Sequence, residues 1–348
     1  MENEIILQTF NNNSYKNKNL FKNILKNITK IKELGITKIL VPPLSESYDD
    51  YGYFPNNYYN FNSNYGNKED IISLSQKIDL ISEVSIWKKF KNLKRKNYNF
   101  DNTILNTTNE IIIYKELLKY IRFLNNEFNI KNIKISNLSD NFSNNFIKYL
   151  SNNEPKINII CDKLIDMSYI NFIPDYNQHK HRMDLSKSID LDTNFYSIDF
   201  TTKGLLNYVF ESKEWWRLSD DNSNPSGLIG FKKYYKNSFT FVDNHETIQN
   251  WKLSNDYILE AYIYIVFHPG IPIIFIDHYN DYYDDLKYLL TIKKFYKINN
   301  FDCGTICQSN VYGYTYIIKN IAICFGKTKI KGEKIFQYNL VKIIEIKR

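Results

Sequence analysis

Apolar residues recur along this chain in two patterns, short runs and longer stretches at helical spacing. The first part shows both: an apolar run over 5–10 precedes apolar positions three and four residues apart over 20–31, and Gly35 follows. A short run of this kind predicts a buried strand, and the wider spacing predicts an amphipathic helix. A glycine just past such a stretch is typical of a helix C-terminus. The opening of the chain therefore predicts one strand–helix unit.

The same unit repeats to about residue 300. Further strands are predicted at 38–43, 80–87, 133–135, 157–161, 195–200, 239–242 and 271–276, and further helices at 69–77, 111–128, 142–150, 181–189, 204–216, 256–267 and 286–298. Alternating strands and helices imply a parallel sheet with right-handed crossovers, and eight such units close best as a barrel. We therefore predict an α/β fold, a (β/α)8 TIM barrel over residues 1–300.

The pattern changes near Thr305. Two short strands are predicted at 315–319 and 321–325, joined near Asn320. Short strands joined by a tight turn favour antiparallel pairing. The segment 301–348 is therefore predicted to be a small antiparallel C-terminal β domain.

Composition adds few constraints. The chain has 348 residues and a net charge of +7, with lysine spread along its length, so the charge alone does not indicate a nucleic-acid partner. The densest basic segment, Lys88–Lys96, has two interpretations: a solvated loop, which we favour, or a patch for an anionic partner. The four cysteines lack the spacing of a zinc site or a disulfide framework and are interpreted as reduced.

The N-terminus and the apolar runs bear on where in the cell the protein is expected. The N-terminus passes from Met1 directly into the first predicted strand, without the basic and apolar regions of a signal peptide, so a cytoplasmic protein is expected. The apolar run 258–267 is too short to span a bilayer, so no membrane segment is predicted. The sequence leaves the oligomeric state open.

Candidate chemistry begins where the predicted strand at 239–242 ends. A packet of polar residues follows it directly: Asp243, Asn244, His245 and Glu246. Barrel enzymes place their active-site groups at the carboxyl ends of the strands, so this packet marks the end of the barrel to search. The alternative interpretation is a strand end followed by turn-forming residues.

Several segments together resemble the α-amylase family of glycoside hydrolases, most of all its plant-type members. The matching motifs occur in the family's order on the predicted strands and lie at 5–11, 41–47, 52–55, 199–204, 241–245 and 268–272. The resemblance runs nearly the whole length of the chain. It implies a (β/α)8 barrel and retaining hydrolysis of α-1,4-glucan, such as starch or glycogen.

The resemblance also gives positions for the catalytic groups. In the family, one carboxylate attacks the sugar carbon and a second protonates the leaving oxygen. The nucleophile position falls on Ser136, with Lys134 in place of the usual arginine; the acid position falls on Asp162, and that of the third carboxylate on Glu246. The family pattern has aspartate, glutamate and aspartate at these three positions, so the resemblance implies that all three are substituted here. A serine needs a nearby base to act, and the sequence identifies none.

Other family features survive in part. Tyr53 matches an aromatic residue that stacks on the sugar, and Asn244 and His245 match a pair that binds its hydroxyls. The motif on the third strand falls on Glu83, Trp87 and Lys88 and is changed throughout. The inserted domain that carries the family's calcium ligands is predicted to be absent, so no metal or other cofactor is expected.

Three hypotheses follow. The favoured one is an α-amylase-like protein that is catalytically impaired or inactive and retains binding of α-glucan or maltooligosaccharide. The second is an active hydrolase with shifted carboxylates, recruiting Asp101 or Asp140. The third is a non-enzymatic scaffold that uses the basic loop Lys88–Lys96.

Overall fold

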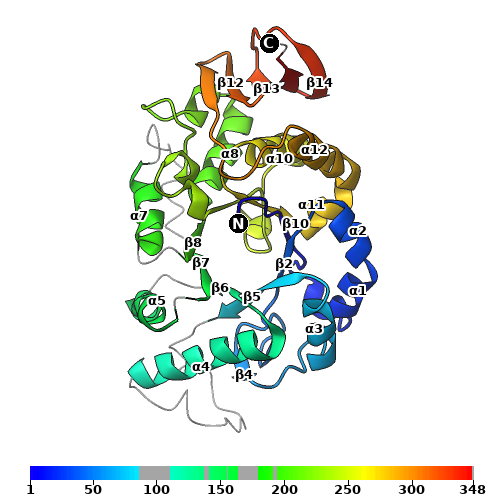
Figure 1. The fold of residues 1–348 in the computed structure, drawn as a ribbon, viewed down its shortest axis with the longest axis vertical. Helices are drawn as coiled ribbons and strands as arrows, with labels where there is room; N and C mark the ends of the chain where they lie inside the picture. Colours follow the sequence, from blue (N-terminus) through cyan, green and yellow to red (C-terminus); the bar gives the residue numbers. More distant parts are fainter. Residues whose placement is uncertain (86–109, 137–140, 155, 164–178, 191–193, 347–348) are drawn as a thin grey trace.

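Eight parallel strands form a closed barrel in the computed structural model, which describes residues 1–85, 110–136, 141–154, 156–163, 179–190 and 194–346 (Figure 1). Around the barrel the order is β1-β10-β9-β8-β7-β6-β5-β2. The predicted (β/α)8 barrel is thereby confirmed. Its strands are β1 (Ile6–Gln8), β2 (Lys38–Val41), β5 (Asp79–Ser85), β6 (Asn132–Ser136), β7 (Asn158–Cys161), β8 (Phe195–Ile198), β9 (Ser238–Phe241) and β10 (Ile271–Phe275).

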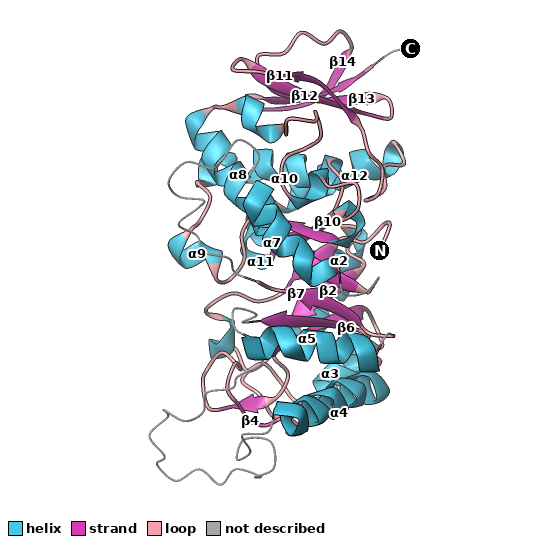
Figure 2. Ribbon diagram, turned by 90° about the vertical axis from the view of Figure 1, so that its left-hand side faces the viewer, coloured by secondary structure: helices cyan, strands magenta, loops and turns pink. Residues whose placement is uncertain are grey.

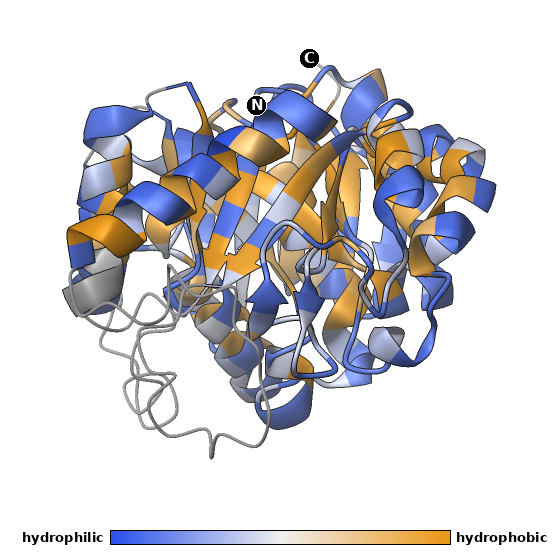
Figure 3. Cartoon of the chain, turned by 90° about the horizontal axis from the view of Figure 1, so that it is seen from below, coloured by the Kyte–Doolittle hydropathy of each residue, from blue (hydrophilic) through white to orange (hydrophobic). Residues whose placement is uncertain are grey.

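Helices surround the barrel, and Figure 3 shows them as an outer layer around apolar strands. A small hairpin, β3 (Glu46–Ser47) with β4 (Pro55–Asn57), lies in the connection that follows β2. The described helices are α1 (Leu20–Lys26), α2 (Ile28–Glu33), α3 (Lys68–Ser75), α4 (Glu110–Phe128), α5 (Asn141–Asn153), α7 (His179–Ile189), α8 (Phe200–Ser212), α9 (Thr247–Asn250), α10 (Ile258–Phe267), α11 (Ile276–Asp281) and α12 (Tyr283–Phe295). No helix of these described segments is long and apolar enough to cross a membrane.

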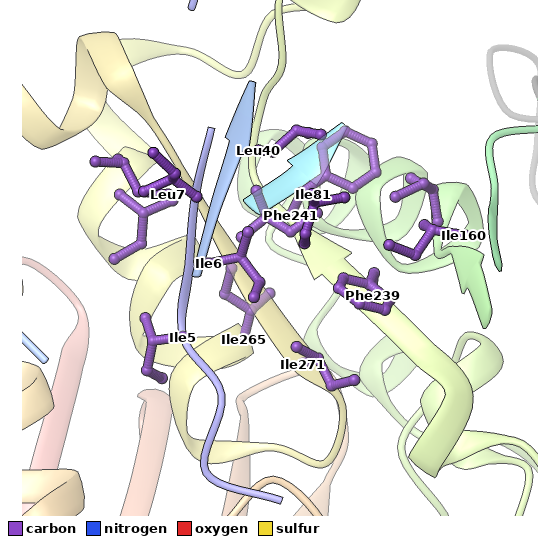
Figure 4. Close-up of a cluster of buried hydrophobic side chains, with 14 of the residues drawn as sticks. Ile5, Ile6, Leu7, Leu40, Ile81, Ile160, Phe239, Phe241, Ile265 and Ile271 are labelled. Carbon is purple, nitrogen blue, oxygen red and sulfur yellow. The ribbon is translucent and has the colours of Figure 1, made fainter. Parts of the chain in front are cut away.

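The barrel is packed with side chains. Ile6, Ile81 and Phe239 gather in one buried cluster in Figure 4, and each is at most 2% exposed. Phe239 meets Tyr196 of the neighbouring strand edge to face. Burying one such side chain contributes roughly 1.5–3 kcal/mol, so this cluster is a main source of stability for the barrel.

Helix α8 starts and ends earlier than predicted. The apolar Phe200 extends the strand pattern, which is why the sequence predicts a later start for the helix. The structure instead places the helix start at Asp199, whose carboxylate accepts hydrogen bonds from the Thr202 amide at 2.9 Å and the Thr202 hydroxyl at 2.6 Å. Such a cap satisfies N–H groups that would otherwise lack partners. The helix ends where Lys213 adopts a left-handed conformation with φ of 60°. A short 3-10 helix, η2 (Trp215–Leu218), occupies the rest of the predicted helix.

The first predicted helix is two helices, α1 and α2, which meet at Asn27. The Asn27 amide donates to the carbonyl of Asn23 at 2.9 Å. Asparagine side chains compete in this way with the backbone bonds of a helix. The apolar spacing continues across the break, which is why the pattern alone predicts one helix.

The C-terminal segment forms a five-stranded antiparallel sheet in the order β11-β12-β13-β15-β14, as predicted (Figure 2). Its Phe325 packs against the rings of Phe210 and Trp215 and so joins the sheet to the barrel layer. Helix α12 ends at Phe295 and β11 begins at Thr305; the domain boundary at 300 stays a prediction. The strands are β11 (Thr305–Ser309), β12 (Gly313–Ile318), β13 (Ile321–Gly326), β14 (Glu333–Tyr338) and β15 (Val341–Glu345).

Glu260 on α10 is buried near the turn between β14 and β15. From its burial we predict that the stability of the folded chain depends on pH. Burial raises the pKa of Glu260 to about 7, although Lys213 and the Leu340 amide oppose the shift. A carboxyl with a raised pKa in the folded state lowers stability as pH rises from its unfolded value toward 7. Glu260→Gln is therefore expected to stabilise the chain by roughly 2 kcal/mol at pH 8 and to have little effect below pH of about 4.5.

Urea unfolding at the two pH values measures this difference. The control is Glu33→Gln, at an exposed position on α2. A gain at pH 8 that persists unchanged at low pH would contradict the assignment to Glu260 ionisation.

Candidate active site

One buried ammonium group joins the ends of three adjacent strands. Lys134 on β6 lies opposite Glu83 on β5, and Asp162 directly follows β7. The Lys134 Nζ is 2.7 Å from Glu83 Oε1 and 2.5 Å from Asp162 Oδ2, and the side chains are at most 3% exposed. Because both oxygens contact the same nitrogen, the distance between them is at most the sum of these two distances. Both carboxyl groups therefore lie in one small charged cluster.

Ser136 belongs to the same cluster. Its hydroxyl donates to Glu83 Oε1 and accepts a hydrogen bond from Lys134 Nζ at 3.3 Å. Glu83 Oε1 thus receives two donors, whereas Glu83 Oε2 is buried and has no hydrogen-bond partner within the described part of the chain. The cluster holds the Glu83 carboxyl by one oxygen and leaves the other unused.

The charges in this cluster shift each other's pKa values. Burial alone would lower the pKa of Lys134, but Asp162 and Glu83 outweigh it and raise that pKa. Burial works to raise the pKa of Glu83, yet the charge and hydrogen bond of Lys134, with the bond from Ser136, lower it. Burial dominates at Asp162 and raises its pKa. Glu83 is therefore the more firmly ionised of the two carboxyl groups.

A second, neutral group of side chains surrounds His245. The Gln8 amide donates both to the Phe10 carbonyl at 3.0 Å and to His245 Nδ1 at 3.1 Å, which assigns the imidazole proton to Nε2. That nitrogen lies 2.5 Å from the Tyr53 hydroxyl. Burial lowers the pKa of His245 to about 4, so the ring is neutral at pH 7. Tyr53 and His245 also lie nearly parallel, with ring centroids 6.1 Å apart.

Glu246 lies at the outer side of this neutral group. Its Oε1 is 3.8 Å from His245 Nε2, and 39% of its side chain is exposed. Loss of hydration at the carboxyl, together with the negative charge of Asp162, raises the pKa of Glu246. A carboxyl with a raised pKa holds its proton more readily near neutral pH, as a general acid must.

The Asn244 side chain binds the backbone where α9 begins, and its sugar-binding role stays a prediction. Its Oδ1 accepts from the Glu246 amide at 3.0 Å and the Thr247 amide at 2.8 Å, at the start of α9. Asp243 forms a buried ion pair with Lys203 at 2.7 Å. Both interpretations of the polar packet therefore apply: Asp243 and Asn244 stabilise the strand end, and His245 and Glu246 face the charged cluster.

The structure brings most of the predicted site residues together. Ser136, Lys134 and Asp162 share one cluster, and Tyr53 contacts His245; their roles stay predictions. Sequence reasoning undervalued Glu83, although a carboxylate within an apolar strand was a usable signal. Other positions named from the sequence, Trp87, Lys88–Lys96, Asp101 and Asp140, lie outside the described residues.

Calcium in proteins takes about six to eight oxygen ligands. Among the residues that the structure describes, no group of three or more histidine, cysteine, aspartate or glutamate side chains is arranged to hold a metal ion.

Known proteins with similar sequence or structure agree on one family. The sequence model described as Alpha amylase, catalytic domain, matches residues 5–81. "Probable alpha-amylase 2" of Arabidopsis thaliana is 25% identical over 356 residues, covering 89% of this chain and 85% of that protein. These matches support membership of the α-amylase family. "Alpha-amylase 3, chloroplastic" of the same plant is 24% identical over 88% of this chain and 38% of its own length.

Solved α-amylase-family structures share the fold. CldA, a cyclomaltodextrin glucanotransferase, superposes with a TM-score of 0.65 at 14% identity, over 99% of this chain and 97% of that one. An α-amylase from Malbranchea cinnamomea superposes with a TM-score of 0.66 at 11% identity, over 93% and 84% of the two chains. At such low identity the likeness concerns the fold alone.

The charged cluster generates a stability prediction. Lys134→Met leaves two buried carboxylates without their shared cation, which is expected to cost about 3–5 kcal/mol of unfolding free energy. Urea unfolding measures the loss. Lys131→Met, at an exposed position just before β6, serves as the matched control.

Neutralising both carboxyl groups in the Lys134→Met background, with Glu83→Gln and Asp162→Asn, is expected to recover part of the loss. A Lys134→Met variant as stable as the control variant would show that the three charges are not coupled.

Proposed function

We propose that this α-amylase-like chain binds α-glucan at the carboxyl end of its barrel and hydrolyses it far more slowly than a typical glycosidase. The observation that supports this most is the shared ammonium of Lys134, which lies against both Glu83 and Asp162. Ser136 stands where the family resemblance places the nucleophilic carboxylate. The chain therefore keeps the scaffold of an α-glucan hydrolase with an altered set of reacting groups.

Each alteration slows a particular step. A serine nucleophile needs a base, and the group that accepts the Ser136 hydrogen bond is Glu83, whose pKa is lowered by Lys134. Asp162, at the position of the family acid, is bound to an ammonium rather than facing a leaving group. Changes of about 1 Å in the position of such groups cost about 100-fold in rate.

Glucan binding rests on the neutral group around His245. An aromatic face and neutral hydrogen-bonding groups suit a sugar, which has apolar faces and many hydroxyls. Tyr53 and His245 supply both kinds of contact. A structure of an α-amylase from Geobacillus thermoleovorans, with a TM-score of 0.60 and 14% identity, is complexed with acarbose. It supports an oligosaccharide ligand for this fold.

The decisive experiment compares binding with turnover. Calorimetry with maltoheptaose is expected to show binding that Tyr53→Ala weakens, while a reducing-sugar assay on soluble starch is expected to give fewer than about 0.1 turnovers per second. Restoring the family residues together, with Ser136→Asp, Asp162→Glu and Glu246→Asp, is expected to give only partial recovery.

The competing hypothesis of an active hydrolase with shifted carboxylates makes the opposite forecast. Starch turnover near the enzyme median of about 10 per second, abolished by Asp162→Ala, would overturn the proposal of impairment.

We also propose that stability does not depend on calcium, because the segment between β5 and α4 is too short for the inserted domain that carries the family's ligands. Thermal unfolding is expected to be unchanged when a calcium chelator is added. A fall in melting temperature of about 5 °C or more, reversed by added calcium, would refute this.

A further inference from the structure

Glu83 and Ser136 lie side by side on adjacent strands. Glu83 is opposite Lys134 in the β5–β6 register, and Ser136 follows Lys134 by two positions. Alternate residues of a strand share a face, so all three side chains point to the same side of the sheet. The hydrogen bond from Ser136 Oγ to Glu83 Oε1 shows that the Glu83 carboxyl reaches the end of the side chain at position 136.

This contact decides which residues position 136 accommodates. An aspartate there would place its carboxyl carbon about where the serine Oγ now lies, within hydrogen-bond distance of Glu83 Oε1. It would also bring a second negative charge against a buried carboxylate, which is unfavourable. An aspartate at 136 is therefore disfavoured while Glu83 is charged. This point of the barrel still has a negative carboxylate, but Glu83 on β5 supplies it rather than the residue at position 136 on β6.

We propose that Glu83 is the nucleophile for the slow hydrolysis that this chain performs, in place of the aspartate missing from β6. This proposal rests on glucan binding at the carboxyl end of the barrel, as proposed above. Glu83 Oε2 forms a bond to the anomeric carbon, and the bond from that carbon to the leaving oxygen breaks, with its electron pair going to the oxygen. The leaving oxygen takes the proton of Glu246. Water then cleaves the ester and returns a proton to Glu246.

The geometry of Glu83 suits this role. Lys134 and Ser136 both hold Oε1, which fixes the orientation of the carboxyl, while Oε2 has no hydrogen bond within the described residues. The charge of Glu83 also acts on the Tyr53 hydroxyl and on the His245 ring, the two groups proposed to bind sugar. The lowered pKa of Glu83 and the raised pKa of Glu246 give the protonation states that a nucleophile and an acid need.

The competing interpretation is that Glu83 is only a partner that balances the charge of Lys134. The Glu83 side chain has no exposed surface, which is also the expectation for a purely structural ion pair. The two interpretations are separated by a substrate whose leaving group needs no proton donor. Its cleavage depends on the Glu83 carboxylate only if Glu83 is the nucleophile.

The test uses 2-chloro-4-nitrophenyl α-maltotrioside, whose phenolate leaves without acid assistance. The wild-type chain is expected to release phenolate above the buffer blank, and Glu83→Gln is expected to lower kcat by about 100-fold or more with little change in KM. Glu33→Gln, the same change at an exposed position, is the control and is expected to have no effect. A fluorosugar that traps the glycosyl ester is expected to label the peptide containing Glu83 in mass spectrometry.

A double-mutant cycle tests the exchange between strands. Ser136→Asp alone is expected to lower both the melting temperature and phenolate release, and Glu83→Gln combined with Ser136→Asp is expected to recover both, because the double variant again has a single carboxylate at this point. Full activity in Glu83→Gln, no phenolate release by wild type, or a Ser136→Asp variant as stable and active as the double variant would each overturn the assignment of Glu83.

These outcomes separate the two proposals. If the chain binds maltoheptaose but does not release phenolate, the role of Glu83 is refuted and the proposed function stands. If starch turnover is fast and still depends on Glu83, impairment is refuted and the role of Glu83 stands. Without maltoheptaose binding and without phenolate release, both are refuted.

Discussion

The ammonium of Lys134 is the constraint on which this end of the barrel depends. It lies against Glu83 and Asp162 in a region with almost no exposure to water, where an unpaired charge would cost several kcal/mol. Because its partners come from strands on either side, the same interaction fixes the relation of β5, β6 and β7 at their carboxyl ends. Stability and candidate chemistry thus depend on the same three side chains.

Charged and neutral groups occupy separate zones at this end. The charged cluster is buried, whereas the neutral network of Gln8, His245 and Tyr53 leads toward the more exposed Glu246. A neutral sugar gains little from a full charge, but it gains from aromatic faces and from oriented donors and acceptors. The outer zone therefore suits the proposed recognition of a sugar, and the inner zone holds the proposed nucleophile.

Much of the fold follows from the sequence, since hydrophobic spacing predicts every barrel strand and the change to antiparallel strands near Thr305. The errors arise where one polar side chain overrides that spacing. The Asn27 side chain bonds to the Asn23 carbonyl where α1 and α2 meet, and Asp199 caps α8, which begins four residues before the predicted position. Local apolar patterns carry no information about such bonds.

The candidate site was harder to predict, because its partners are distant in the chain. The spacing of Lys134 and Ser136 on one strand places both on one face, but Glu83 is 51 residues away and enters only through the strand register. Asn244 shows a contact that its residue type does not reveal: it suits sugar binding, and its Oδ1 also accepts from the backbone amides of Glu246 and Thr247. Residue identity gave candidate positions, and only the three-dimensional contacts gave their partners.

The substitutions relative to the family pattern form a coupled set. An ammonium has three donors, and Lys134 has three acceptors within reach: Glu83, Asp162 and Ser136. An arginine at this position would bring five donors in a rigid fork and would need further acceptors in the same enclosed volume. Ser136 and Asp162 are shorter than the family residues at these positions, and Glu83 is long enough to reach Ser136 from β5. Charge, hydrogen bonding and volume are thus balanced among neighbours, so reversal of one substitution alone disturbs all three.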